Sequence, residues 1–135
     1  MNRNAITAEA VRWIGTPYHH QGSTRGAGCD CLGLVRGTYR ALYGPEPVRL
    51  PAYAQYDTGE GERLIAELRA HLRETSSPLP GDILVFRLRE RYAATLAFCS
   101  KTNALCMPSV GGACAAPRCR RGGDAASRRP SRFRT

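Results

Sequence analysis

Hydrophobic residues recur three or four positions apart in three parts of the chain, and this spacing predicts three amphipathic helices. They cover about residues 7–14, where Gly15 and Pro17 end the pattern, residues 31–43, and residues 60–73. The apolar faces consist, in order, of Ile6, Ala10, Trp13 and Ile14; of Leu32, Val35, Tyr39 and Leu42; and of Leu64, Ile65, Leu68 and Leu72.

A different pattern follows the third helix. Four consecutive apolar residues at 83–86 come after a Gly-Asp pair, which predicts a turn into a buried strand. Beyond Ala94 no periodicity remains, and from Ser109 onward the chain is mostly Gly, Ala, Ser, Pro, Cys and Arg. Such a composition does not offset the entropy of ordering a chain. We therefore expect one domain over residues 1–93 and an atypical, poorly ordered basic tail over 94–135.

The net charge of +9 belongs mostly to this tail. Up to Phe98 the chain has twelve Lys or Arg against ten Asp or Glu, whereas from Cys99 onward it has eight against Asp124 alone. Apart from Phe133, the arginines of the tail lack the interleaved aromatic residues that stack on bases. We expect weak, salt-sensitive attraction to polyanions at most, and no specific nucleic-acid partner.

Targeting and membrane signals are not predicted. The first residues are not followed by an apolar stretch of signal-peptide length, and no run of roughly 18 apolar residues could span a bilayer. We expect synthesis in the cytoplasm, where a reducing environment keeps the six cysteines as free thiols.

Candidate chemistry lies at residues 28–35, which read Gly-Cys-Asp-Cys-Leu-Gly-Leu-Val. Cys31 falls on the first turn of the second predicted helix, directly after Asp30, a residue type that caps helices. Unpaired backbone N–H groups and the helix dipole at that position stabilise a thiolate and lower its pKa. Cys31 is therefore a candidate nucleophile. The alternatives are that Cys31 is a buried structural thiol and that Cys29 only packs in the core.

Three segments, in this order, resemble the NlpC-like cell-wall cysteine peptidases, most closely the small versions found in phage tails and gene-transfer agents. They are residues 13–18 (Trp-Ile-Gly-Thr-Pro-Tyr), 30–35 (Asp-Cys-Leu-Gly-Leu-Val) and 79–86 (Leu-Pro-Gly-Asp-Ile-Leu-Val-Phe). The resemblance implies a papain-like α+β fold with N-terminal helices on a small antiparallel sheet. It also implies that Cys31 is the nucleophile, supported by Asp30 and with Tyr18 nearby. Leu32 stands where the family usually has serine.

The resemblance further implies the substrate and the setting. The substrate would be the stem peptides of peptidoglycan, cut at amide bonds without a cofactor or metal. The partners would be other tail and hub proteins of a phage-like particle that acts on the wall of a target cell. The alternative is a structural tail-hub or baseplate component that keeps the peptidase fold without its chemistry.

The general base that such chemistry needs is missing from its expected place. Members of the family carry it as a histidine at the start of the strand after the Pro-Gly-Asp strand, but this chain has no histidine after His71. His71 lies among charged residues and is expected to be solvated. His19 and His20 are weak candidates, so the base is unassigned. The chain as written is expected to have an incomplete sheet and little or no activity.

The neighbouring reading frame offers an explanation. Shifted by one base, the codons of residues 94–108 can spell His-Ala-Gly-Val-Leu-Leu-Glu-Asp-Glu-Arg-Phe-Val-His-Ala, which is what the family shows at this point. We hypothesise that a frameshift near residues 92–94 replaced the native C-terminus. The tail cysteines would then be accidents of reading frame. They could otherwise join Cys29 and Cys31 as metal ligands, but they lack the paired Cys-x-x-Cys spacing of such sites, and no metal is predicted.

Overall fold

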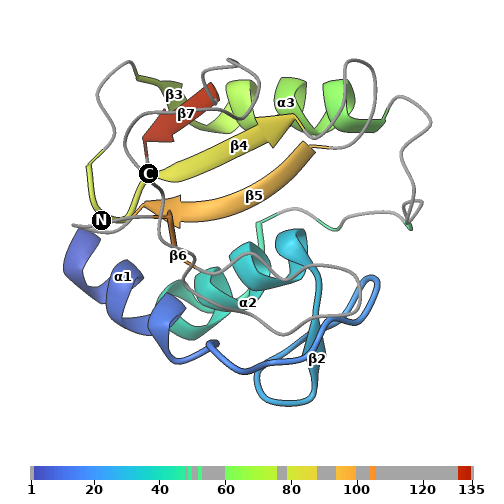
Figure 1. Cartoon of the computed structure of the whole chain (residues 1–135). Helices are drawn as coiled ribbons and strands as arrows, with labels where there is room; N and C mark the ends of the chain where they lie inside the picture. The colour runs from blue at the N-terminus through green and yellow to red at the C-terminus, as the bar shows by residue number, and fades with distance from the viewer. Residues whose placement is uncertain are drawn as a thin grey trace, which may run out of the picture.

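The computed structural model describes residues 2–47, 49, 52, 60–75, 79–87, 94–99, 104–105 and 131–134. Figure 1 shows the arrangement of the elements. In chain order they are α1 (Arg3–Val11), β1 (Ser23–Thr24), β2 (Gly28–Cys29), α2 (Cys31–Tyr43), α3 (Glu60–His71), β3 (Arg73–Glu74), β4 (Ile83–Arg87), β5 (Ala94–Cys99), β6 (Ala104–Leu105) and β7 (Ser131–Arg134).

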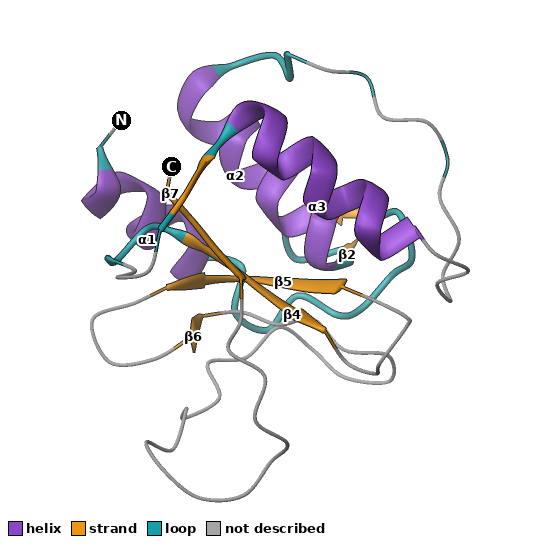
Figure 2. Cartoon of the chain, turned by 90° about the horizontal axis from the view of Figure 1, so that it is seen from above, coloured by secondary structure: helices purple, strands orange, loops and turns teal. Residues whose placement is uncertain are grey.

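The strands form one antiparallel sheet and one small hairpin. The sheet has the order β3-β7-β4-β5-β6, and β1 pairs with β2 separately. In its centre, Ile83 of β4 lies opposite Phe98 of β5, and Arg87 lies opposite Ala94. Figure 2 shows α2 and α3 on the same side of the sheet. This is the α+β arrangement that the sequence predicts, with helices packed on a small antiparallel sheet.

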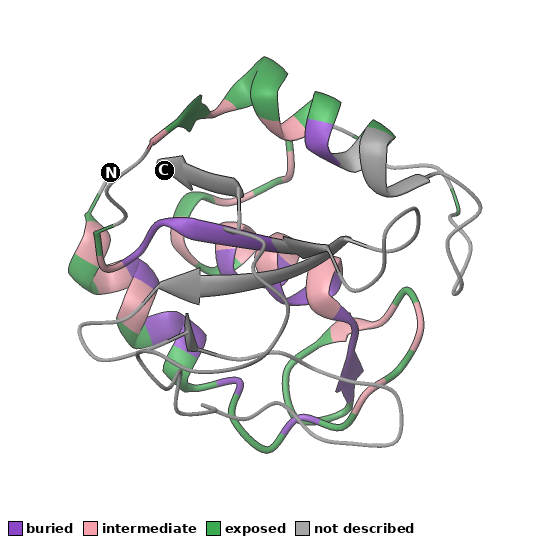
Figure 3. Cartoon of the chain, turned by 45° about the horizontal axis from the view of Figure 1, so that its top comes forward, coloured by how far each residue is buried: buried purple, intermediate pink, exposed green. Residues whose placement is uncertain are grey.

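The core lies between the helices and the central strand. Its buried residues come from α1, α2, α3, β2 and β4 and include Trp13, which follows α1. In Figure 3, β4 is coloured as buried where its burial is described. Ile83 and Val85 belong to this cluster, whereas Leu84 between them is buried outside it. The alternation follows from the strand itself, because successive side chains point to opposite faces of a sheet.

The predicted bounds of a helix are correct where its capping residues could be recognised in the sequence. Helix α2 begins and ends as predicted, between the N-cap Asp30 and Gly44 at φ 88°. Helix α1 begins four residues earlier than predicted, because the side chain of Asn2 accepts a hydrogen bond from the Ala5 N–H at 3.1 Å and caps it. It ends before Ile14, which is 45% exposed and was wrongly assigned to the buried face.

The predicted apolar face of α2 packs against the core, but it is not the most deeply buried side of the helix. The buried positions are Gly33, Leu34, Gly37 and Thr38, whereas Leu32, Val35 and Leu42 of the predicted face are only partly buried against the core. The reason is close packing by other segments: a Cβ at Gly37 would lie 2.2 Å from the Trp13 ring. Two glycines four residues apart thus allow other parts of the chain to lie directly on the helix backbone.

A buried ion pair joins the first helix to the sheet. The Asp82 carboxylate is fully buried and accepts a hydrogen bond from Arg3 at 2.5 Å and one from the Leu79 N–H at 2.8 Å. The aspartate of the Pro-Gly-Asp segment therefore shapes the turn into β4 and fixes α1 to it.

Three strands of the sheet, β5, β6 and β7, come from the segment 94–135 that the sequence sets apart. The remainder of that segment lies outside the described residues. The expectation that the segment is poorly ordered falls on those residues and stays a prediction. Among the helices that the structure describes, none has the length and apolar character to cross a membrane.

Candidate active site around Cys31

Cys31 is the first residue of α2 and is partly buried. Asp30 before it is extended (φ −101°, ψ −176°), and its Oδ1 accepts a hydrogen bond from the Gly33 N–H at 2.6 Å. The first intrahelical bond runs from the Leu34 N–H to the Asp30 carbonyl at 2.9 Å. Leu32 is the second residue of α2, so its N–H has no acceptor within the helix. The thiol therefore lies at a helix N-terminus, as the sequence predicts, next to a backbone donor that a ligand can use.

The other face of the Asp30 carboxylate holds the loop that precedes the hairpin. Its Oδ2 accepts a hydrogen bond from the Gln21 N–H at 2.8 Å and lies 3.9 Å from Nδ1 of His20. The Asp30 N–H donates to the Gly22 carbonyl at 3.2 Å. One side chain thus caps the nucleophile helix and fastens residues 20–22 to it.

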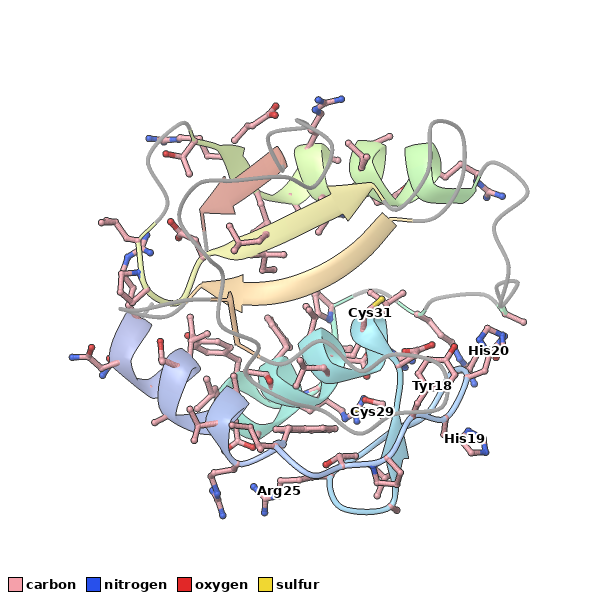
Figure 4. The ribbon with its side chains drawn as sticks, viewed as in Figure 1. Tyr18, His19, His20, Arg25, Cys29 and Cys31 are labelled. Atoms are coloured by element: carbon pink, nitrogen blue, oxygen red, sulfur yellow. The ribbon has the colours of Figure 1, made fainter. Side chains whose placement is uncertain are left out.

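Tyr18 is placed by backbone contacts with β2. It forms an isolated parallel bridge with Cys29, whose N–H donates to the Pro17 carbonyl and whose carbonyl accepts from the His19 N–H, each at 3.0 Å. Figure 4 shows Tyr18 and His20 at the same end of α2 as Cys31. The structure thus brings the predicted residues Tyr18, Asp30 and Cys31 into one region.

Cys29 has a different environment from Cys31. Its side chain is fully buried, and burial raises the pKa of the thiol from 9.0 to about 11, with further contributions from the charges of Asp30 and Cys31. The Cys29 thiol is therefore protonated near neutral pH and is a poor nucleophile.

The three histidines of the sequence lie in two places. His19 and His20 belong to the loop before the hairpin, where Nδ1 of His19 lies 3.0 Å from the His20 carbonyl. His20 is brought to the capping carboxylate of Asp30. His71 lies at the end of α3 with an exposed side chain, 3.8 Å from Glu67. The structure does not bring His71 to the candidate site.

The beginning of β5 lies at the same end of the molecule as the beginning of α2, as Figures 1 and 2 show. Residues directly opposite in antiparallel strands share a face. Position 94 therefore lies on the face of the sheet that carries Ile83 and Val85 in the core, and α2 packs against β5 on that side. This strand is where the family resemblance predicts a histidine, and here it begins with Ala94.

A polar network next to the site was missed by sequence reasoning. Arg40 donates to Ser23 and to Glu46, and the Ser23 hydroxyl donates to the Gly33 carbonyl at 2.6 Å. The bonded partners are 6 to 17 positions apart in the sequence. The one available signal was the pair of glycines in α2, Gly33 and Gly37, whose spacing indicates a face open to close packing.

Metal binding finds no support among the residues that can be described. Neither Cys29 nor Cys31 is in a disulfide, and no three His, Cys, Asp or Glu side chains form a cluster there that could hold an ion. The side chains of the other four cysteines lie outside the described set.

Comparisons with known proteins support the fold. No family model matches the chain. Gamma-DL-glutamyl hydrolase from Bacillus subtilis (strain 168) is 31% identical over 81 residues, which are 60% of this chain but only 17% of that protein. The crystal structure of the NlpC/p60 domain of the peptidoglycan hydrolase SagA matches with a TM-score of 0.62 and 23% identity, over 87% of this chain and 90% of that one. The chain has the fold of the NlpC/p60 domain.

Proposed function

We propose that this chain is an NlpC-like cysteine peptidase domain that hydrolyses amide bonds in peptidoglycan stem peptides, with Cys31 as the nucleophile. The observation that carries the proposal is the position of Cys31 at the start of α2, behind the Asp30 cap, in a chain with the NlpC/p60 domain fold. The sequence similarity to a segment of gamma-DL-glutamyl hydrolase supports the same class of chemistry.

The proposed reaction has two steps. The Cys31 thiolate attacks the scissile carbonyl, and the resulting oxyanion accepts a hydrogen bond from the Leu32 N–H at the helix start. The C–N bond then breaks, the amine leaves with a proton, and a thioester remains on Cys31. Water hydrolyses the thioester, which releases the carboxylic acid and regenerates the thiol. A base must take the thiol proton and later supply it to the amine, and this role is unassigned.

The substrate class follows from the two similar proteins. One is named a gamma-DL-glutamyl hydrolase and the other a peptidoglycan hydrolase. Amide bonds next to γ-linked glutamate in cell-wall peptides satisfy both descriptions, so they are the first substrates to test.

The proposed setting is a phage-like tail tip, where the domain would assemble with hub proteins and act on the wall of a target cell. Its support is the resemblance of residues 13–18, 30–35 and 79–86 to the tail-associated peptidases. The proposed frameshift near residues 92–94 belongs to the same interpretation. Resequencing the gene across this stretch tests it, and a single long frame without a coding alternative overturns it.

A structural role is the second candidate, and one observation favours it. All three histidines precede Ala94, so the strand β5 carries no imidazole. A tail-hub component with the peptidase fold and no catalytic base would have this composition.

The two candidates are separated by an activity assay of the purified protein on isolated cell walls, with Cys31→Ala as the matched variant. Release of new amino groups by the original protein and not by Cys31→Ala supports the peptidase. Equal release by both proteins removes Cys31 from the mechanism. No release by either favours the structural role.

A further inference from the structure

We propose that Ser23 and Arg40 are positioning residues for the Cys31 site, and that they hold residues 18–23 in place against the first turns of α2. The inference rests on the proposed function, because it treats Cys31 as the reacting group. Both residues lie outside the sequence segments that carry the family resemblance.

Ser23 is bound from both sides. Its hydroxyl donates to the Gly33 carbonyl at 2.6 Å, while Nη2 of Arg40 donates to the Ser23 hydroxyl at 2.7 Å and to the Ser23 carbonyl at 2.5 Å. A charged donor polarises the hydroxyl that it binds, which strengthens the bond that this hydroxyl donates. The chain from Arg40 through Ser23 to the helix backbone therefore acts as one unit.

The loop meets α2 at two glycines, Gly33 and Gly37, which have no side chain to hold the two segments apart. A Cβ at Gly33 would lie 1.7 Å from the Gly22 carbonyl oxygen, and a Cβ at Gly37 would lie 3.3 Å from Oγ of Ser23. Gly33, Gly37 and Arg40 follow one another at helical spacing, so they share a face of α2. Loop and helix backbones meet directly on this face, and the polar contacts of Ser23 set their relative position.

Arg40 is itself held from the other side. Glu46, just after α2, accepts hydrogen bonds from Arg40 and from Nε of Arg36, the latter at 2.7 Å. The hydrogen bond from Arg36 is the main reason that the pKa of Glu46 lies below its usual value of 4.5. Glu46 is therefore charged at neutral pH and fixes the guanidinium that binds Ser23.

The segment that these contacts hold is the one beside Cys31. It begins with Tyr18, which bridges to Cys29, and continues through Gln21 and Gly22, which bind Asp30. Figure 4 shows Tyr18 and His20 at the Cys31 end of α2. Ser23 holds the C-terminal end of this segment on α2. Loss of its hydrogen bonds therefore lets Tyr18 and His20 move relative to the thiol, which changes both access to Cys31 and its ionisation.

The test compares Ser23→Ala with Ser23→Thr, which keeps the hydroxyl, and with Thr7→Ala as a matched control. The Thr7 hydroxyl donates to the Arg3 carbonyl at 3.0 Å within α1, so this control removes a hydrogen bond of the same kind from another element. The readout is the second-order rate constant of Cys31 alkylation by iodoacetamide as a function of pH, with a melting curve for each variant. We expect Ser23→Ala to shift the pH midpoint of this constant by about one unit and to change the constant itself by about tenfold below the midpoint, because the thiolate is the reacting form. Ser23→Thr restores the profile, and Thr7→Ala leaves it unchanged.

Identical pH profiles for the original protein and Ser23→Ala overturn the proposal, as does an equal change in Thr7→Ala. If Ser23→Ala does not fold, Arg40→Lys replaces it, because lysine keeps the charge but loses the two-nitrogen fork that binds Ser23 and Glu46 together. Cell-wall hydrolysis is measured in parallel. Failure of the original protein to hydrolyse cell walls counts against the peptidase function alone, because alkylation of Cys31 does not depend on turnover.

Discussion

Cys29 and Cys31 are separated by one residue, yet their places in the backbone give the two thiols different burial and different surroundings. Cys31 lies at a helix start with polar donors nearby, whereas Cys29 is buried in β2. Asp30 between them contributes to both environments: it caps the helix of one thiol and raises the pKa of the other. The sequence alone predicts the first effect, because a cap next to a cysteine is a local pattern.

Alkylation distinguishes the two thiols. Iodoacetamide near neutral pH is expected to label Cys31 and to leave Cys29 unmodified, because the Cys29 thiol is buried and protonated. Mass spectrometry of the labelled peptides gives the ratio directly. In denaturant both residues should react at similar rates, which serves as the control. Equal labelling in the folded protein would contradict the assignment of Cys31 as the activated thiol.

The pKa of Cys29 also predicts how stability depends on pH. Its value is raised from 9.0 to about 11 in the folded state, so folding favours the protonated thiol. Its contribution is fully present below pH 9 and is lost as the pH rises toward 11, with a total of about 3 kcal/mol. Chemical denaturation at several pH values measures this. The difference in stability between the original protein and Cys29→Ala should shrink across this range, and a constant difference would refute the linkage.

Helix α2 shows what can and cannot be predicted for an element. Its bounds follow from residues next to its ends, Asp30 and Gly44, and they were predicted correctly. Its most deeply buried side was not, because that side is set by Trp13 and Gly22, which approach from distant parts of the sequence. A periodic pattern shows where the large apolar side chains lie. Close packing of two backbones occurs instead at glycines, which have no side chain and so do not contribute to that pattern.

The contact at Gly33 gives a direct test of this packing. Gly33→Ala places a methyl group 1.7 Å from the Gly22 carbonyl oxygen, so the loop or the helix must move. We expect a loss of about 3 kcal/mol in the free energy of unfolding. Gly26→Ala is the comparison: it has open space but φ +81°, and backbone strain alone should cost about 1 kcal/mol. Similar losses in both variants would mean that the close approach is absent in solution.

Strand β5 allows the missing base to be tested by gain of function. Ala94→His introduces an imidazole on the face of the sheet against which α2 packs, at the end where Cys31 lies. Thr95→His introduces the same group one residue later, on the opposite face. Cell-wall hydrolysis that rises in the first variant and not in the second is the expected outcome. Equal activity in the two variants would show that the register of β5 does not place a base.

At the scale of the whole molecule, the fold depends on ties between segments that are far apart in the chain. Arg3 and Asp82 are 79 residues apart and join α1 to the entry of β4. The Pro-Gly-Asp segment was recognised in the sequence as part of the family resemblance, but the partner of its aspartate was not. An ion pair over such a separation leaves no pattern in a single sequence.

Removing the charge of Asp82 tests this tie. Asp82→Asn leaves Arg3 facing a neutral group at a fully buried position, and we expect it to destabilise the protein by about 3 kcal/mol. Arg69→Gln breaks the exposed pair with Glu74 and should change stability by less than about 0.5 kcal/mol. Urea denaturation of both variants measures the difference. Equal and small losses would show that α1 is not anchored through Asp82.

Trp13, two residues after α1, makes the packing of this part of the chain on α2 visible to spectroscopy. It is the only tryptophan of the chain, its ring lies against Gly37, and its indole N–H donates to Glu9 at 3.2 Å. Intrinsic fluorescence excited at the indole band therefore comes from a single fluorophore, seated on the same helix that begins with Cys31. With a quencher attached to the Cys31 thiol, the intensity of Trp13 emission reports the distance between the indole and the start of α2, and no second dye is needed.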